Sequence, residues 1–105
     1  MPKILRLTLF KIPEPAHIEE AVKQYSTLTK DAVKDGNPYI SVAQATPTLD
    51  EPRNQGFTLV ARTVFDSKED MEYYDTACAA HGEIKALLKG KVAAPPCTLL
   101  MDMKE

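Results

Sequence analysis

The first predicted strand, Ile4–Phe10, constrains the fold most, because apolar side chains occupy both of its faces. The side chains alternate between two sets, Leu5, Leu7 and Leu9 on one face and Ile4, Arg6, Thr8 and Phe10 on the other. A period of two is typical of a strand, and leucine is stabilised by leaving water. We therefore expect a sheet that is at least partly covered on both faces. Arg6 is the exception on its face: it is either solvated at an exposed strand end or a cation pointing into a pocket.

The remaining elements are predicted in the order helix, strand, strand, helix and strand. A long amphipathic helix runs from Pro15 to Gly36, with apolar residues at three- and four-residue spacing. The further strands are predicted at Tyr39–Thr46, Gly56–Phe65 and Cys97–Met103. This order is the split βαβ pattern of ferredoxin-like folds, an α+β class with a four-stranded antiparallel sheet and helices on one face.

Length and charge limit the functional classes. A chain of 105 residues is one domain by size, here spanning residues 1–105. A net charge of −2 without a Lys/Arg run predicts no nucleic-acid partner, and no apolar run nears the roughly 20 residues that span a bilayer. The first residues lack a signal-peptide pattern, so Cys78 and Cys97 are expected to be reduced thiols of a cytoplasmic protein. The two histidines and scattered carboxylates show no metal-ligand spacing, so no metal is expected.

The second face of the predicted sheet has no cover within the chain. By strand parity it carries five aliphatic side chains, Leu5, Leu7, Leu9, Val60 and Val64. An uncovered apolar surface of this size is unusual for a monomer. Two such sheets packed face to face would cover it, so we expect a homodimer formed through these residues.

The stretch Met71–His81 carries the groups most able to move a proton. Ser67 and Asp70 form a helix-start signal, since a hydroxyl and a carboxylate three residues apart bind the first free N–H groups. If one helix runs from there to His81, four side chains share one face: Met71, Tyr74, Cys78 and His81. Gly82 would then end the helix, and the helix dipole would favour a charged imidazole at His81.

Two interpretations of this helix face stay open. On one continuous helix Tyr74 and His81 would lie about 10.5 Å apart, too far for a direct hydrogen bond, so they would grip two ends of a ligand. Alternatively, His81 caps the last carbonyls of its helix and Tyr74 belongs to the core. Cys78 is either a nucleophile activated by His81 or inert packing. Asp75 is expected at the surface or at an interface.

Three segments carry a resemblance to a known family. They read I-L-R-L-T-L-F-K-I, N-Q-G-F-T-L-V-A-R-T-V-F-D-S-K-E-D-M and Y-Y-D-T-A-C-A-A-H. In this order they resemble the first strand, the third strand with the entry into the second helix, and the aromatic and Ala-His positions of the stress-responsive α/β-barrel (Dabb) family, within the dimeric α+β barrel superfamily. The resemblance covers nearly the whole chain. It implies a homodimer in which two four-stranded sheets close into one barrel.

The resemblance also implies a catalytic pair. Some family members are cyclases or related enzymes of polyketide chains, in which a helix histidine is the acid/base and an upstream tyrosine orients or protonates. Carried over, these residues are His81 and Tyr74. Arg6 stands where the family often has a histidine, and Ala79 where it usually has a proline. Because arginine does not deprotonate, Arg6 can only donate hydrogen bonds or bind an anion.

Strand parity and the resemblance together place a ligand pocket between the sheet and the helices. Its predicted lining consists of Arg6, Thr8, Phe10, Tyr25, Leu28, Leu59, Ala61, Cys78, Thr98 and Leu100. Such a lining suits a small aromatic or polyketide-like molecule with an anionic or carbonyl group near Arg6. The turn-rich segment Pro47–Gln55 either covers this site or is simply a hairpin loop.

Three functional hypotheses follow. The first is a cyclase or lyase without a cofactor, in which a neutral imidazole removes an acidic C–H proton and a phenol binds the enolate. The second is a non-catalytic, stress-responsive protein that binds a small ligand or only dimerises. The third is a haem-using or oxygen-using relative with His81 as axial ligand.

Overall fold

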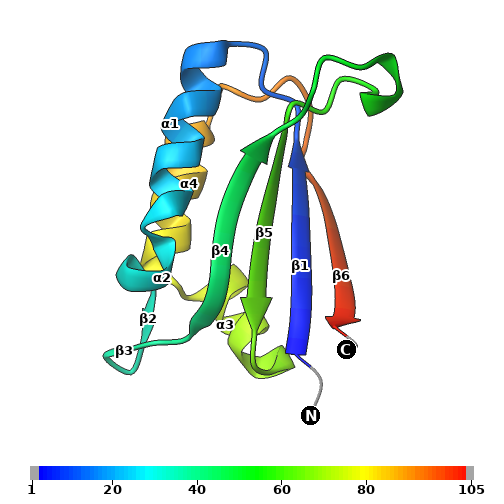
Figure 1. Ribbon diagram of the computed structural model, residues 1–105. Coiled ribbons are helices and arrows are strands. Elements are labelled where there is room, and N and C mark those ends of the chain that lie inside the picture. The colour runs from blue at the N-terminus through cyan, green and yellow to red at the C-terminus, as the bar shows by residue number, and fades with distance from the viewer. Residues whose placement is uncertain (1–2, 104–105) are drawn as a thin grey trace.

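The main elements of the computed structural model follow the predicted order (Figure 1). The structure describes residues 3–103, so the ends of the predicted domain, residues 1–2 and 104–105, lie outside the described residues. The longer elements are β1 (Lys3–Phe10), α1 (Pro15–Ser26), β4 (Ile40–Pro47), β5 (Leu59–Phe65), α3 (Lys68–Thr76), α4 (Ala79–Leu88) and β6 (Cys97–Met103). The shorter ones are α2 (Leu28–Asp31), β2 (Val33–Lys34), β3 (Asn37–Pro38) and a 3₁₀ turn, η1 (Pro52–Asn54).

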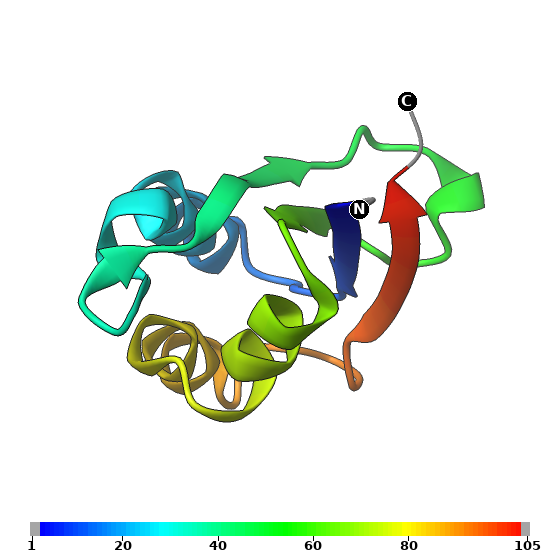
Figure 2. The ribbon, with the colours of Figure 1, turned by 90° about the horizontal axis from the view of Figure 1, so that it is seen from below.

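The four long strands form one antiparallel sheet in the order β4-β5-β1-β6. Strand β1 is central and pairs with β5 on one side and with β6 on the other. Figure 2 shows the helices gathered on one face of this sheet. The predicted ferredoxin-like α+β fold is therefore confirmed. Among residues 3–103, no helix has the length and apolar character needed to cross a membrane.

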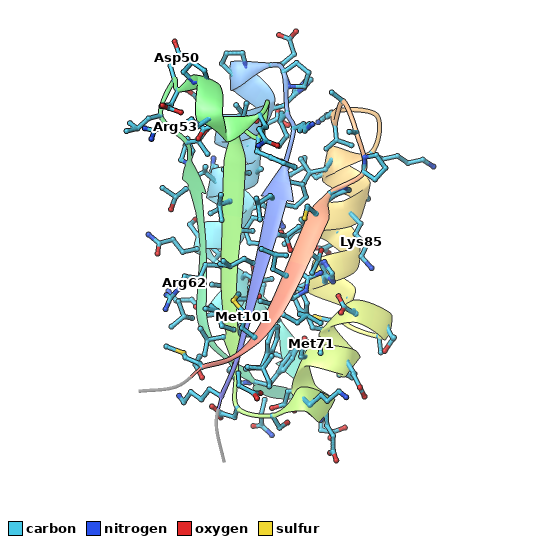
Figure 3. All side chains as sticks on the ribbon, turned by 90° about the vertical axis from the view of Figure 1, so that its right-hand side faces the viewer. Asp50, Arg53, Arg62, Met71, Lys85 and Met101 are labelled. Carbon is cyan, nitrogen blue, oxygen red and sulfur yellow. The ribbon has the colours of Figure 1, made fainter. Side chains whose placement is uncertain are left out.

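The register of β1 decides which side chains face away from the helices. Its three leucines lie opposite Val64, Arg62 and Val60 of β5, and directly opposite residues share a face. The five aliphatic side chains predicted to share one face therefore do so. Val64 is buried within the single chain, whereas the leucines of β1 and Val60 are half-buried. Figure 3 shows Arg62 on the side of the sheet away from α4, which carries Lys85.

The predicted helix from Pro15 to Gly36 begins correctly but ends too late. Pro15 is its first residue, where the missing N–H costs nothing. Helix α1 stops at Ser26, and the single turn α2 follows. The segment has β-branched residues at positions 27, 29 and 33, which lose side-chain freedom in a helix. Gly36, with φ of 81°, lies instead in the turn between β2 and β3.

The prediction of one helix from Ser67 to His81 is wrong, although its start is confirmed. The Ser67 hydroxyl accepts a hydrogen bond from the Asp70 backbone N–H at 3.1 Å. Helix α3 ends at Thr76, whose hydroxyl donates to the Glu72 carbonyl at 2.8 Å. Such bonds bend helices and compete with their continuation. After Ala77 and an extended Cys78 the chain starts a new helix, α4.

The break between α3 and α4 reverses the predicted setting of His81. His81 lies in the first turn of α4, and Gly82 lies inside that helix rather than after its end. The positive end of the helix dipole is therefore near the imidazole, which disfavours a charged ring. The prediction that the dipole favours imidazolium at this position is wrong for the same reason.

Candidate ligand pocket

A cavity of about 540 Å³ opens between the sheet and α4. Six of the side chains predicted for the site line it: Arg6, Thr8, Phe10, Tyr25, His81 and Thr98. Strand β1 presents the first three because alternate residues point to the same face. The two elements that were predicted to supply catalytic and binding groups, the first strand and the second helical region, are thus brought together.

The other predicted residues lie elsewhere. Leu28, Leu59, Ala61 and Cys78 are buried in the hydrophobic core and are not among the residues lining the cavity. Leu100 lies opposite Arg6 in the sheet, yet it is 50% exposed, because β6 is an edge strand that the helices do not cover at this point. For the strand residues Leu59, Ala61 and Leu100, strand parity gives the correct face but not the extent of the cavity.

Helix α4 and the residues around it supply lining that the sequence did not assign to the pocket. Ile84 and Leu88 are apolar at a spacing of four, and Lys85 and Lys89 repeat that spacing one position later. Asp75, expected at the surface or an interface, also lines the cavity. The four-residue spacing of Ile84 and Leu88 was a usable signal. Asp75 had none, since its contact with Arg6 depends on how α3 packs beside β1.

Arg6 is buried in the cavity, with 7% of the residue exposed. Its Nη1 donates to the Thr8 hydroxyl at 2.7 Å, and its Nη2 donates to Oδ1 of Asp75 at 2.9 Å. The guanidinium carbon lies 5.1 Å from the ring centroid of Tyr74. The Nε atom of Arg6 is buried and has no hydrogen-bond partner among residues 3–103. The interpretation of Arg6 as a solvated residue at a strand end is therefore wrong.

His81 is held against Tyr74 by two contacts. Its Nδ1 lies 2.8 Å from the backbone carbonyl oxygen of Tyr74, and the two rings stack with centroids 3.8 Å apart and planes 10° apart. The predicted 10.5 Å separation is wrong because the chain turns between α3 and α4. Since a carbonyl oxygen only accepts, Nδ1 carries the proton of the neutral ring. The unprotonated nitrogen is then Nε2.

Burial lowers the pKa of His81 to about 4. The hydrogen bond to the Tyr74 carbonyl opposes this shift, the positive charges of Arg6 and Lys85 lower the pKa further, and Asp75 raises it slightly. The imidazole is therefore neutral near pH 7. A neutral imidazole with one free nitrogen accepts a proton or a hydrogen bond from a ligand.

Two buried tyrosines flank the site, and only one of them lines the cavity. That one is Tyr25, whose pKa burial raises to about 12 while the Arg6 charge opposes the rise. Burial also raises the pKa of Tyr74, and its hydroxyl has no partner within the described part of the chain. Tyr74 instead contributes its ring, which lies between Phe65, His81 and the Arg6 guanidinium. The phenol at the cavity wall is therefore that of Tyr25.

The residues that the structure describes contain no group of three or more side chains able to hold a metal ion. The mouth of the cavity is charged: Lys85 donates from Nζ to the Asp75 carbonyl oxygen at 3.2 Å, and Lys89 lies one turn further along. Most of the remaining wall is apolar. This combination suits a small, mainly apolar molecule with a few polar groups.

Comparison with known proteins identifies the family. The model of the stress responsive A/B barrel domain matches residues 4–97. The chain belongs to the stress responsive A/B barrel domain family. The chain also resembles a "Fusaristatin A biosynthesis cluster protein" of Gibberella zeae. The two sequences are 41% identical over 86 residues, which is 82% of this chain. The match spans 62% of that relative's length, so the relative is the longer protein.

Solved structures share the fold of the A/B barrel domain. A dimeric protein of ferredoxin-like fold from Bacteroides fragilis has a TM-score of 0.77 at 12% identity and covers 96% of both chains. Hydroxynitrile lyase from Passiflora edulis has a TM-score of 0.76 at 14% identity and covers 99% of this chain and 95% of its own. A protein from Arabidopsis thaliana has a TM-score of 0.66 at 25% identity, with coverage of 100% and 95%.

Proposed function

We propose that this A/B barrel domain binds a small aromatic or polyketide-like molecule in the cavity and acts on it as a lyase or cyclase without a cofactor. The observation that carries this proposal is the state of His81. It is a buried neutral imidazole whose Nδ1 is fixed on a backbone carbonyl, so Nε2 is the nitrogen left for a ligand. An imidazole in this state is in its base form near pH 7 and can accept a proton from carbon next to a carbonyl group, although its lowered pKa makes it a weaker base than a solvated imidazole.

The proposed reaction is a proton transfer. Nε2 of His81 takes the C–H proton, the carbon–hydrogen electron pair moves toward the carbonyl, and negative charge develops on its oxygen. The phenol of Tyr25 donates to that oxygen, and Tyr74, the tyrosine implied by the resemblance, supports the imidazole ring through stacking. Because burial and the Arg6 charge oppose imidazolium, His81 gives the proton back readily to the next acceptor.

The names of similar proteins support the choice of reaction class. The Gibberella zeae relative is named for a biosynthesis cluster, and one structural neighbour of the same fold is named a hydroxynitrile lyase. The cavity adds that the ligand is small, since about 540 Å³ is near the lower part of the range for ligand sites.

We also propose that two copies pair through the sheet face away from the helices. This face carries the leucines of β1, and Leu99 and Met101 of β6 extend it, with 45% and 37% exposed. Removing such side chains from water is favourable. Several structural neighbours are described as dimeric.

A reducing compartment such as the cytoplasm agrees with the free thiols of Cys78 and Cys97.

The test of the proposed reaction follows hydrogen exchange on a carbon acid. The A/B barrel domain is incubated in D₂O with 1-phenylbutane-1,3-dione, and deuterium entry at the central carbon is followed by NMR with and without protein. We expect acceleration that His81→Asn reduces by about 100-fold, the usual size of a general-base contribution. The matched variant is His17→Asn, since His17 lies on α1 and does not line the cavity.

The same experiment reports on the non-catalytic alternative. Adding the dione while observing the imidazole of His81 by NMR shows whether the cavity is occupied. A perturbed His81 signal without accelerated exchange would support a dimeric binding protein rather than an enzyme. An unperturbed signal, together with no acceleration, would contradict both ligand binding and catalysis.

A further inference from the structure

We propose that the ligand of this cavity carries a carboxylate and that this carboxylate binds to the Arg6 guanidinium. Before the ligand enters, the Asp75 carboxylate occupies that position on Arg6, and the ligand displaces it. This inference rests on the proposed function, because it concerns the same cavity. It narrows the ligand from any small aromatic or polyketide-like molecule to an acid. The chemical class is an aromatic acid or a 3-oxo acid.

The first argument is the incomplete bonding of the Arg6 guanidinium. Thr8 fixes Nη1 and Asp75 contacts Nη2, but Nε has no partner among residues 3–103. A buried N–H without a partner costs free energy, and native proteins rarely leave one. Nε and Nη2 point along the same edge of a guanidinium, and this edge matches the two oxygens of one carboxylate. Asp75 uses half of that edge.

The second argument is the unequal burial of the two partners. The Arg6 side chain is 8% exposed, whereas the Asp75 side chain is 37% exposed. Asp75 can therefore turn toward water and remain solvated, whereas the Arg6 guanidinium is buried in the cavity and needs a partner there. A ligand carboxylate can therefore replace Asp75 in this ion pair, while Arg6 keeps its position.

The third argument is the charge of the cavity wall. Arg6, Lys85 and Lys89 bring three positive charges, against one negative charge from Asp75. His81 is neutral near pH 7, so an excess of two positive charges remains. A wall of this sign raises the local concentration of anions. After displacement, Asp75 would still lie beside Lys85, which already contacts its backbone.

The position of Arg6 also limits where the acid group stands on the ligand. The Arg6 guanidinium and the His81 ring both lie against the ring of Tyr74, at 5.1 Å and 3.8 Å from its centroid. Arg6 and His81 also line the same cavity, so one small ligand can contact both. A carboxylate close to an acidic C–H or a phenol is the pattern of 3-oxo acids and hydroxylated aromatic acids.

The test compares two probes of nearly equal shape, 3,5-dihydroxybenzoate and 3,5-dihydroxybenzamide, by isothermal titration calorimetry at pH 7. We expect the wild type to bind the acid at least tenfold more tightly than the amide. Arg6→Gln should bind both equally. Asp75→Asn should bind the acid about threefold to tenfold more tightly than the wild type, because the competing anion is gone. Arg53→Gln removes the same charge from an exposed arginine far from the cavity and should change nothing.

Each outcome decides between the two proposals. If the amide binds as well as the acid, the carboxylate receptor is refuted while the small-molecule pocket stands. Binding of neither probe would overturn both proposals. If Arg6→Gln still binds the acid more tightly than the amide, another residue binds the carboxylate, and the role proposed for Arg6 is refuted. Should Arg6→Gln fail to fold, as judged by its amide NMR spectrum, Asp75→Asn decides alone, and unchanged affinity for the acid refutes the displacement.

Discussion

The two faces of strand β1 depart from the usual pattern of a monomeric sheet. Toward the helices the strand presents Arg6 and Thr8, both buried, beside the core residue Phe10. Away from the helices it presents leucines that stay half-buried in the single chain. In an antiparallel sheet with one covered face, apolar residues normally point to the covered side and polar residues to water.

These two faces correspond to the two parts of the proposed function, ligand binding and dimerisation. Polar groups are costly to bury unless they are bonded, so the inner polar residues indicate a site rather than a structural core. Apolar groups on an outer face indicate an interface. In the proposed function the central strand binds the ligand with one face and its dimer partner with the other, so alternate substitutions along β1 should affect either ligand binding or dimerisation but not both.

The largest effect is expected from a charge at the centre of the outer face. Leu7→Asp replaces a leucine that lies between Arg62 of β5 and Leu99 of β6. Each dimer would lose two leucine contacts and bury two carboxylates, which costs about 3 kcal/mol or more of association free energy. Light scattering should then give the 11.6 kDa mass of one chain instead of twice that mass.

The control for this substitution lies on the outer side of a helix. Glu19→Lys changes the charge at an exposed position of α1 and should leave the mass of the dimer unchanged. A wild-type mass of 11.6 kDa at micromolar concentration would overturn the proposed interface. A Leu7→Asp variant that remains dimeric would place the interface elsewhere.

The next effect is a loss of stability in acid that depends on His81. The folded pKa is about 4, below the ordinary value of 6.5, so the unfolded chain binds the proton more readily. The contribution of neutral His81 is therefore complete above about pH 6.5 and falls as the pH drops toward 4. We expect a loss of about 2 kcal/mol in the free energy of unfolding, after allowing for solvent screening.

Urea denaturation between pH 7 and pH 4 measures this loss, and NMR titration of the imidazole measures the pKa directly. The variant His81→Gln should lose much less stability over the same interval, whereas His17→Gln should follow the wild type. An imidazole of His81 that titrates near 6.5 would show that the ring is solvated and would remove the basis of the proposed base.

The two faces of β1 also show how much of the fold the sequence predicts. Period-two alternation in β1 and β5 depends on the pleat of each strand alone, so the sheet, its faces and the helix start at Ser67 follow from local rules. The fold is predictable at this level. The way in which strands distant in sequence pair with one another does not change which face of the sheet a residue occupies.

The cavity is less predictable because it depends on two helix ends that carry no strong signal. The residues between α3 and α4 are Ala77 and Cys78, and neither is a glycine or proline. Without a break, His81 stays far from Tyr74. The stack of the two rings and the setting of His81 in the first turn of α4 both follow from this one turn of the chain, which tertiary packing decides. The Arg6–Asp75 ion pair depends instead on how α3 packs beside β1.

A smaller effect is expected at the ion pair that lies on the inner face. Asp75→Asn leaves the buried Arg6 charge without its counter-ion and should cost about 1–2 kcal/mol of unfolding free energy, less than for a fully buried pair because Asp75 is partly exposed. Asp66→Asn breaks an exposed pair with Lys3 and should cost under about 0.5 kcal/mol. Equal losses in urea denaturation would show that Arg6 does not depend on Asp75.

The smallest effect separates the two tyrosines of the site. Tyr25→Phe removes the hydroxyl at the cavity wall and should weaken binding of 1-phenylbutane-1,3-dione about threefold to tenfold, the value of one hydrogen bond. Tyr74→Phe keeps the ring that stacks on His81 and removes a hydroxyl that has no partner within residues 3–103, so affinity should stay within about twofold. Calorimetry with both variants gives the comparison. The opposite result, with Tyr74→Phe the weaker binder, would favour the tyrosine implied by the family resemblance and would mean that the helices move when a ligand enters.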